Sequence, residues 1–406
     1  MKGYGADTLG RLLRPATTEE FLASSWGRAH LHVRGPADKF SALMPWPRLN
    51  EILRGHRLDF PRLRLARDGK ALPFSSCVRR VQGGRRKVTV PRLLPNELTR
   101  HLREGATLVL DAVDEVQPAI EEIASGLEHL FRERVQVNLY AGFQTSRGFD
   151  LHWDDHDVFV LQVAGRKRWS VYGMTRPYPL APDVEAAERP RGAPVWEETL
   201  EAGDLLYIPR GWWHVAMPLA EPTLHLTVGV HNRTGHDLLR WLTERMRASE
   251  DYRRDLPRFA PPVERAAHLA RMREELLAAF DEGVLERYFE EYDAGAEPRP
   301  RVGLPWSASG ELLPPDSDPP VRLLPPRPLA FREEGGDVAF DFRRRRWRFG
   351  AAALPVLRRL EEGRVCTLAE LHEAAGGALE RETVRAFVAE LVAQGLVAVV
   401  EEPPAA

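Results

Sequence analysis

The chain of 406 residues has little of several features that often signal a function. It has only two cysteines, Cys77 and Cys366, which lie far apart, so the sequence offers no disulfide framework and favours a reducing, cytoplasmic location. No run of about 18 apolar residues occurs, and residues 1–7 lack an apolar signal core, so we expect neither membrane insertion nor export. Its 57 basic and 59 acidic residues almost balance, which excludes a general attraction to nucleic acid or to anionic membranes.

The most informative pattern is a set of metal-ligand types between residues 152 and 214. His152 and Asp154 are two positions apart, so in an extended strand their side chains would point the same way, about 6 to 7 Å apart. His214 follows after an apolar run at 205–208 and a bend. Two imidazoles and one carboxylate leave metal positions open, as in non-haem Fe(II) oxygenases, although zinc hydrolases can use the same ligand types.

Lys167 favours the first of these two chemistries. It follows the strand-like run 158–163 and a tight turn, and it would share one strand face with Trp169 and Val171. If that face is the interior of a barrel, the ammonium needs a counter-charge, because an unpaired buried charge is very costly. A dicarboxylate cosubstrate would supply the counter-charge. A single His-x-Asp pattern is common without a metal, and Lys167 and His214 together favour a site.

At these residues the sequence resembles the JmjC oxygenases. Within them it is most similar to the ribosomal oxygenases, which hydroxylate histidine or arginine side chains of ribosomal proteins. The resembling segments are Asn138-Leu139-Tyr140, His152-Trp153-Asp154-Asp155, and residues 157–162, 165–169 and 203–214. The segment 141–144 departs from the family's pattern, so the loop that approaches the substrate is expected to differ.

The resemblance implies a 2-oxoglutarate-dependent dioxygenase that acts on a protein or peptide, most simply a ribosomal protein. Fe(II), the metal, would be held by the catalytic residues His152, Asp154 and His214. Dioxygen and 2-oxoglutarate would be its cosubstrates. The residues implied for binding 2-oxoglutarate are Lys167, Asn138, Tyr140 and Thr227. The ligands alone leave hydroxylation and demethylation both open.

The fold class that we predict is α+β. Short strands separated by turns between about residues 135 and 232 favour a double-stranded β-helix of the cupin or JmjC kind. The predicted domains are a JmjC/cupin catalytic domain at 1–235 with N-terminal helical and strand additions, a helical region at 236–297, a Pro-rich linker at 298–330 and a winged-helix-like domain at 331–406. The resemblance assigns the helical region to a homodimer.

The winged-helix-like domain is predicted to contact protein rather than DNA. Its presumed recognition helix mixes Arg381 and Arg385 with acidic residues, which would repel phosphates. The basic run 343–348 keeps a nucleic-acid role open, since arginine beside tryptophan can hold a phosphate and stack on a base. A second basic cluster, at 79–87, is read as a solvated hairpin tip, with an acidic or RNA-bound partner as the alternative.

Several polar residues near the metal pattern are assigned roles other than metal binding. His156 is placed in the pocket wall or in a hydrogen bond to a ligand, and the remaining histidines in the core or on the surface; these are His225, His231 and His236. Asp155 and Asp157 are expected to place negative charge at the mouth, which suits a cationic substrate side chain. The segment 173–199 would either cover the opening or form a disordered surface loop.

Two other functions remain open from the sequence. One is an oxygenase that tailors a biosynthetic peptide or a small metabolite, which the departure at 141–144 and the 173–199 segment both allow. The other is a metal-binding cupin without catalysis, used as a scaffold or sensor. Lys167 argues against the inert cupin, because such a protein has no need of a buried ammonium.

Overall fold

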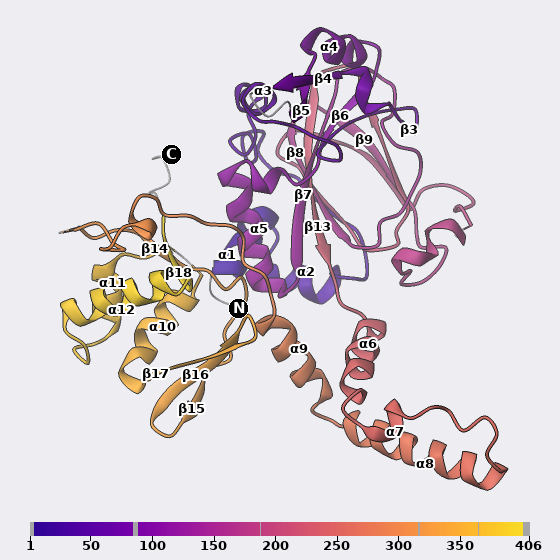
Figure 1. Cartoon of the computed structure of the whole chain (residues 1–406). Coiled ribbons are helices and arrows are strands. Elements are labelled where there is room, and N and C mark those ends of the chain that lie inside the picture. Colours follow the sequence, from indigo (N-terminus) through magenta and orange to yellow (C-terminus); the bar gives the residue numbers. More distant parts are fainter. Residues whose placement is uncertain (1–3, 84–87, 187, 316, 364, 401–406) are drawn as a thin grey trace. The chain divides into compact units, whose positions relative to one another are not determined.

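The computed structural model describes residues 4–83, 88–186, 188–315, 317–363 and 365–400 (Figure 1). The chain divides into two compact units, Met1–Asn232 and Arg233–Ala406. Within the described ranges no helix is both long and apolar enough to cross a membrane.

Two antiparallel sheets form the double-stranded β-helix of the first unit, as predicted. The larger sheet runs in the order β1 (Leu31–Val33), β11 (Leu205–Ile208), β8 (Asp157–Ala164), β13 (Thr223–His231), β7 (Arg134–Gly142), β6 (Thr107–Leu110), β2 (Leu63–Arg67) and β3 (Lys70–Ala71). The smaller sheet runs β10 (Trp196–Leu200), β9 (Lys167–Val171) and β12 (His214–Pro218). The hairpin of β4 (Val78–Gly83) and β5 (Val88–Leu93) flanks the expected basic tip, whose residues Arg85, Arg86 and Lys87 lie outside the described residues.

Strand β8 of the larger sheet is buried on both faces. Along β8, Val158 and Val160 belong to a small apolar cluster shared with strands of the smaller sheet, whereas Phe159 and Leu161 belong to the main core. This alternation follows from the period of two in a strand. Polar side chains on the inner face of the barrel are therefore held between two sheets, where burial changes their chemistry.

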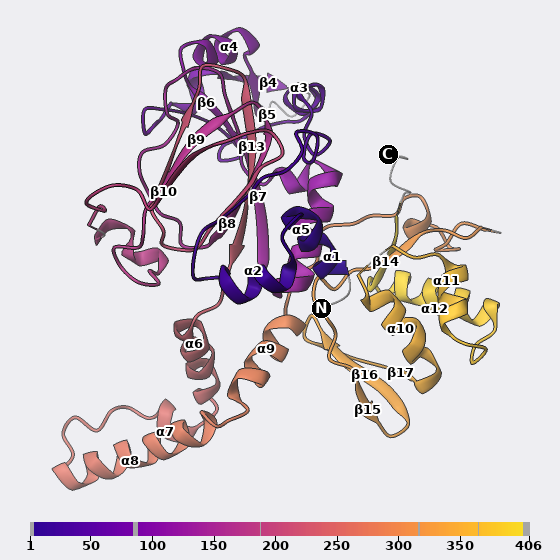
Figure 2. The same cartoon turned by 180° about the vertical axis from the view of Figure 1, so that it is seen from behind.

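Five helices of the first unit contribute to the main core, on which one face of the larger sheet also packs. They are α1 (Tyr4–Leu13), α2 (Thr18–Ser24), α3 (Trp46–Gly55), α4 (Pro95–Arg103) and α5 (Pro118–Phe131). Figures 1 and 2 show α1 and α5 side by side against this sheet. Helix α2 is capped by a reciprocal capping box between Thr17 and Glu20. Phe21 of α2 then packs on Phe159, with ring centroids 5.5 Å apart.

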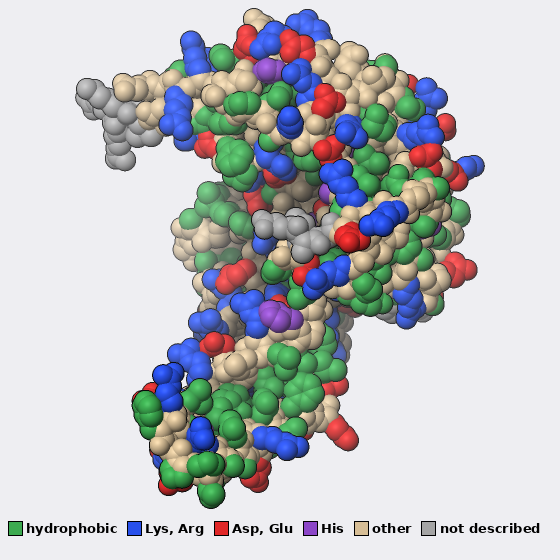
Figure 3. Space-filling view, turned by 90° about the vertical axis from the view of Figure 1, so that its right-hand side faces the viewer, with side chains coloured by type: hydrophobic (Ala, Val, Ile, Leu, Met, Phe, Trp, Pro, Cys, Tyr) green, Lys and Arg blue, Asp and Glu red, His purple; other side chains and the backbone are tan. Residues whose placement is uncertain are grey.

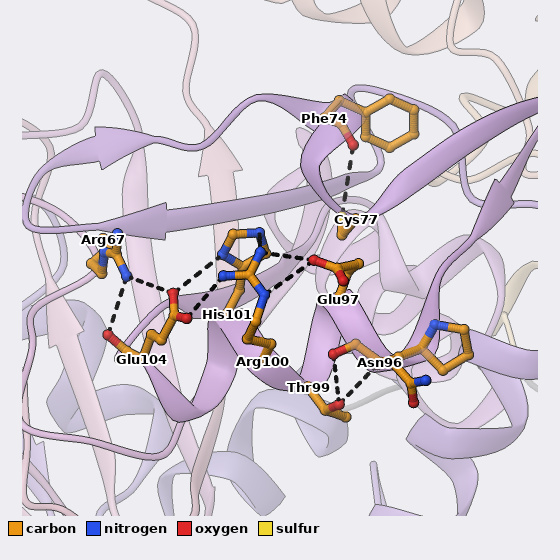
Figure 4. A network of polar contacts seen from close by, with 10 residues as sticks. Arg67, Phe74, Cys77, Asn96, Glu97, Thr99, Arg100, His101 and Glu104 are labelled. Atoms are coloured by element: carbon orange, nitrogen blue, oxygen red, sulfur yellow. Dashed lines mark hydrogen bonds and ion pairs between the residues drawn. The ribbon is translucent and has the colours of Figure 1, made fainter.

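A network of charged side chains fixes α4 at the edge of this unit (Figure 4). Arg100 pairs with both Glu97 and Glu104 within the helix, at 2.7 and 2.8 Å. Arg67, the last residue of β2, reaches Glu104 at 3.4 Å. These exposed pairs orient the helix at its rim, and each contributes about 0 to 1 kcal/mol.

The turn between β8 and β9 carries the chain from one sheet to the other. Gly165 has φ +64°, and a Cβ there would lie 2.2 Å from the carbonyl oxygen of Pro222, so only glycine fits. The turn delivers Lys167 to the first position of β9, where Lys167, Trp169 and Val171 are all buried. The expected strand, tight turn and strand are therefore confirmed, with the added finding that the two strands belong to different sheets.

The second unit begins with four helices, α6 (Gly235–Met246), α7 (Glu250–Arg253), α8 (Pro262–Ala279) and α9 (Val284–Ala294). Its remainder contains β14 (Val321–Leu323), β15 (Arg332–Glu334), β16 (Asp337–Phe342), β17 (Arg345–Gly350), α10 (Leu354–Glu361), α11 (Leu368–Ala374), α12 (Arg381–Ala393) and β18 (Val397–Val399). The three helices α10–α12 share one apolar core with β14, β16, β17 and β18, in the part of the chain for which a winged-helix-like domain is predicted. Thr367 caps α11 through a capping box with Glu370.

Part of the expected Pro-rich linker is packed into this domain. Val321 and Leu323 pair with β18 and are buried, and Leu313 belongs to the same core. The prediction of a linker rests on the prolines at 314–315 and 325–326. They lie on either side of Val321 and Leu323 and do not prevent a short strand between them.

Candidate metal centre

Three side chains with metal-ligand atoms meet at one end of the barrel. The Nε2 atom of His152 lies 3.9 Å from one carboxylate oxygen of Asp154, and the Nε2 atom of His214 lies 3.5 Å from the other. All three ligand atoms lie within 4.8 Å of one another. We name His152, Asp154 and His214 the triad.

Backbone contacts orient both imidazoles of the triad. His152 Nδ1 lies 2.8 Å from the carbonyl oxygen of Asp150, and His214 Nδ1 lies 3.1 Å from that of Trp212. A carbonyl oxygen only accepts, so each Nδ1 carries the proton and donates it. Both Nε2 lone pairs are therefore free to face a metal beside Asp154, the usual way in which a protein fixes the tautomer of a ligating histidine.

The local backbone differs from the strand expected at 152–154. His152 forms only an isolated bridge to His214, with backbone hydrogen bonds of 2.7 and 3.2 Å, and Asp154 lies in an irregular segment. The carbonyl oxygen of Asp154 accepts a hydrogen bond from the backbone N–H of Gly211. The side chains converge because the segment before β8 is tied to the bend before β12, and not because of strand alternation.

The protonation states of the triad suit a cation. Burial, followed by the nearby His152, lowers the pKa of His214 to about 4, so this imidazole is neutral at pH 7. Burial of Asp154 opposes its ionisation, but His214 and His152 outweigh that effect and lower the pKa of the carboxyl. The site therefore presents a carboxylate and a neutral imidazole without first having to lose protons.

Lys167 lies buried in the same barrel and has no hydrogen-bond or ion-pair partner among the described residues. Burial lowers the pKa of its ammonium to about 7. The cation lies 6.0 Å from the ring centre of Trp169. A buried lysine without an anion is unfavourable, so its presence indicates that an anionic group belongs beside it.

A chain of rings links the Lys167 region to the triad. Trp169 lies 6.0 Å from His214 and 5.4 Å from His225, and His225 stacks on Tyr140 at 4.9 Å, all between ring centres. Within the described structure, the buried Nδ1 of His225 and Nε1 of Trp169 have no hydrogen-bond partner. These unpartnered polar atoms fit a bound molecule that carries oxygen atoms.

The two remaining residues of the expected cosubstrate site lie on adjacent strands. Asn138 and Thr227 face each other across β7 and β13. The side-chain oxygen of Asn138 accepts hydrogen bonds from the backbone N–H of Ala112 at 3.0 Å and from Gln136 at 3.1 Å. Its amide group is thereby oriented, and the Asn138 side chain also forms a hydrogen bond with the Tyr140 hydroxyl.

His225 is buried, in agreement with an assignment to the core, and it lies on the inner face of the barrel beside Trp169 and Tyr140. The signal for this position lies in the alternation of β13, where His225 and Thr227 stand between leucines and valine that face the main core. Burial and the charge of Lys167 lower the pKa of His225 well below its usual value. His225 is thus a neutral polar group beside the ammonium.

The expectation that Asp157 supplies charge at the mouth is wrong. Asp157 is buried, and its carboxylate accepts hydrogen bonds from the Tyr207 hydroxyl at 2.6 Å and from Asn232. It links β8 to β11 and to the residue after β13, and is not free to bind a substrate. Within the 173–199 segment, the hydroxyl of Thr175 accepts a hydrogen bond at 2.9 Å from Trp213, next to His214.

Comparison with known proteins identifies this barrel. Residues 115–238 match the model of the JmjC domain family. This segment of the chain is therefore similar to JmjC domains. The chain is 27% identical over 236 residues to the bifunctional lysine-specific demethylase and histidyl-hydroxylase NO66 of Drosophila persimilis. The matched region covers 57% of this chain and 33% of the relative. The chain is 32% identical over 257 residues to ribosomal oxygenase 1 of Gallus gallus, covering 61% of this chain and 41% of the relative.

The fold agrees with the same group of proteins. The chain superposes on YcfD, a ribosomal oxygenase of Escherichia coli, with a TM-score of 0.55 and 18% identity, covering 95% of this chain and 98% of YcfD. YcfD is also known in complex with cobalt and 2-oxoglutarate, and that structure covers 93% of this chain at 19% identity. The resemblance to JmjC ribosomal oxygenases is confirmed, although the chain spans only 33% and 41% of the two curated relatives.

Proposed function

We propose that this protein is an Fe(II)- and 2-oxoglutarate-dependent oxygenase that hydroxylates a histidine or arginine side chain of a ribosomal protein. One observation carries the proposal. A triad of two imidazoles and one carboxylate stands in the same barrel as a buried, unpartnered ammonium, Lys167. A metal with open positions and a cation for a dicarboxylate are the two requirements of this enzyme class.

The residues divide the work between holding the metal and holding the cosubstrate. Iron with 2-oxoglutarate and dioxygen supplies the oxidant for an unactivated C–H bond. The triad would hold the metal through the Nε2 atoms of His152 and His214 and the Asp154 carboxylate. Lys167 would bind the distal carboxylate, assisted by Asn138, Tyr140 and Thr227. The rings around His225 exclude water from that end of the barrel.

The choice of substrate rests on the relatives. YcfD and the Gallus gallus protein are named ribosomal oxygenases, whereas the Drosophila relative is named both a demethylase and a histidyl-hydroxylase. The Drosophila name includes histidyl hydroxylation, and the other two names give an oxygenase with a ribosomal target, so we propose hydroxylation in preference to demethylation. Tailoring of a peptide or metabolite and an inert cupin are the alternative outcomes of the test.

The test is incubation of the full chain with Fe(II), 2-oxoglutarate and a ribosomal protein extract, followed by peptide mass spectrometry. We expect one peptide to gain the mass of one oxygen atom at a histidine or arginine. The Asp154→Ala variant is the matched control and should leave the extract unchanged. Loss of methyl groups instead would assign a demethylase, and turnover of 2-oxoglutarate without any modified ribosomal peptide would favour a different substrate class.

We further propose that the protein is a homodimer that uses the helical region α6–α9. Apolar side chains are exposed there, and Figure 3 shows hydrophobic side chains gathered over these helices. The most exposed are Phe259 at 95% and Val263 at 79%. An apolar patch of this kind on a single chain is typical of a protein interface. Burial by a second copy would remove it from water.

For the winged-helix-like domain we propose a protein-interaction role in the cytoplasm and no DNA binding. The arginines of the 343–348 run are largely neutralised within their own unit. Arg346 pairs with Asp341 and Glu334, and Arg348 pairs with Asp337. Few unpaired cations are then left to neutralise phosphates. A cytoplasmic location is supported by Cys77 and Cys366, which are both free and buried.

A further inference from the structure

A second group of metal-ligand side chains lies next to the triad and shares no residue with it. It consists of Asp155, His156 and His231, whose ligand atoms all lie within 4.8 Å of one another. The Nδ1 atom of His156 is 3.1 Å from a carboxylate oxygen of Asp155. The rings of His156 and His231 lie 4.5 Å apart between centres, inclined by 31°. The oxygenase chemistry proposed above gives these three residues no task.

The fold brings the three residues together from two strands. His156 directly precedes β8, and His231 is the last residue of β13. These strands are paired, with Val158 opposite Gly229, so the two histidines meet at the same end of the sheet. The backbone bends at 155–156, which allows the adjacent side chains of Asp155 and His156 to approach each other instead of pointing apart.

Gly229 makes room for the His156 imidazole. A Cβ at this position would lie 2.6 Å from Cδ2 and 2.8 Å from Nε2 of His156. One edge of the ring therefore rests against the backbone of β13, and Nδ1, on the opposite edge, is directed to Asp155. The imidazole is fixed in the orientation that turns its Nδ1 towards the carboxylate.

We propose that Asp155, His156 and His231 form a second cation site, which takes a divalent ion of the zinc type. Two imidazoles and a carboxylate are ligands that zinc accepts. Ligand atoms in a tetrahedral zinc site are about 3.4 Å apart, given bonds of about 2.1 Å. The pair of Asp155 and His156 already has that spacing. Rotation of the His231 side chain brings its ligand nitrogen to the same spacing from the other two ligand atoms, and water completes the coordination.

An ion at this site links the segment before β8 to the end of β13. Asp154, the carboxylate of the triad, belongs to that segment. The second ion therefore acts as a clamp that restricts the backbone beside the proposed iron ligand. Its role is to position, and it takes no part in the reaction itself.

The test separates the two sites by first removing the triad. In full-length His152→Ala/His214→Ala protein, zinc binding is measured by isothermal titration calorimetry and by metal analysis after dialysis. We expect close to one zinc ion per chain. Adding His231→Ala to this background should weaken zinc binding by at least about tenfold, because loss of even an outer partner of a metal ligand costs about 10- to 100-fold. Asp155→Asn should weaken it as well.

The matched control is His236→Ala in the same background, because His236 is exposed and lies outside the group. It should leave zinc binding unchanged. Far-ultraviolet circular dichroism confirms that each variant is folded. No bound zinc in the folded triad-free protein would overturn the proposal, and so would binding that is equally strong with His231→Ala and Asp155→Asn. Neither result depends on whether the wild-type chain is an oxygenase.

Discussion

Lys167 should destabilise the metal-free protein, and its replacement by methionine should stabilise it. Burial holds the pKa of the Lys167 ammonium at about 7, against 10.5 for an exposed lysine. Between these two pKa values the Lys167 amine is protonated in the unfolded chain and largely neutral in the folded chain, so folding releases a proton there. Lys167→Met keeps a similar volume and removes the buried charge. The Lys167 side chain would therefore lower the free energy of unfolding of the apo-protein, and its ammonium would serve to bind the cosubstrate.

The magnitude follows from the difference between the two pKa values. A pKa difference of about 3.5, at 1.36 kcal/mol for each pH unit, is about 5 kcal/mol. The cost is fully present below pH 7 and disappears as the pH rises through 10.5, because above that pH both states are neutral. We expect Lys167→Met to stabilise the apo-protein by about 3 to 5 kcal/mol at pH 6.5. For a unit of this size that raises Tm by at least about 6 °C.

The assay is thermal unfolding of chelator-treated protein, followed by circular dichroism between pH 6.5 and pH 9.5. The difference in Tm between Lys167→Met and wild type should shrink as the pH rises. Arg168→Met is the matched control, because Arg168 is the exposed neighbour on the same strand and pairs with Glu197. A lower Tm for Lys167→Met, or a difference that does not change with pH, would refute the reasoning.

Three further predictions concern the metal, the dimer and the C-terminal domain. Replacing any triad residue by alanine should lower Fe(II) affinity and abolish 2-oxoglutarate turnover, and turnover by Asp154→Ala would contradict this. Chelation of the metal should leave the fold intact, because the core does not depend on the metal. A thermal melt that collapses on chelation would contradict the second expectation. Phe259→Asp or Val263→Asp should convert a dimer into a monomer in light scattering after gel filtration, and an unchanged mass would remove α8 from the interface. Residues 331–406 should show no tight binding to duplex DNA with a steep salt dependence, and such binding would implicate the arginines of 343–348.

The sequence predicted the parts of the site that depend on local pattern. The apolar run before Lys167 and the tight turn at Gly165 placed the ammonium inside the barrel, and β9 has the predicted face. His152 and Asp154 were correctly expected to lie close together, but for a different reason. Their side chains converge with His214 because the segment before β8 is tied to the bend before β12, through the bridge between His152 and His214 and the bond from Gly211 to Asp154, long-range contacts that spacing in the sequence does not reveal.

Features that depend on strand register could not be predicted. The pairing of β13 with β8 brings His231 to His156, and nothing local to either histidine indicates the other. The carboxylate of Asp157 was also misjudged, because its partners Tyr207 and Asn232 are distant in sequence. The position of His225 on the inner face is different, because the alternation of polar and apolar residues along β13 is enough to indicate it.

The most direct test of the proposed oxygenase is an anaerobic titration of 2-oxoglutarate into the Fe(II)-loaded protein, followed by the metal-to-ligand charge-transfer band. The wild-type chain should develop this band. Lys167→Ala should retain Fe(II) but need about ten to a hundred times more 2-oxoglutarate, since a charge-assisted hydrogen bond is worth about 1.5 to 3 kcal/mol. Lys167→Arg should recover part of the affinity. An unchanged affinity in Lys167→Ala would remove the cosubstrate assignment, and the absence of a band in the wild type would contradict the proposed function.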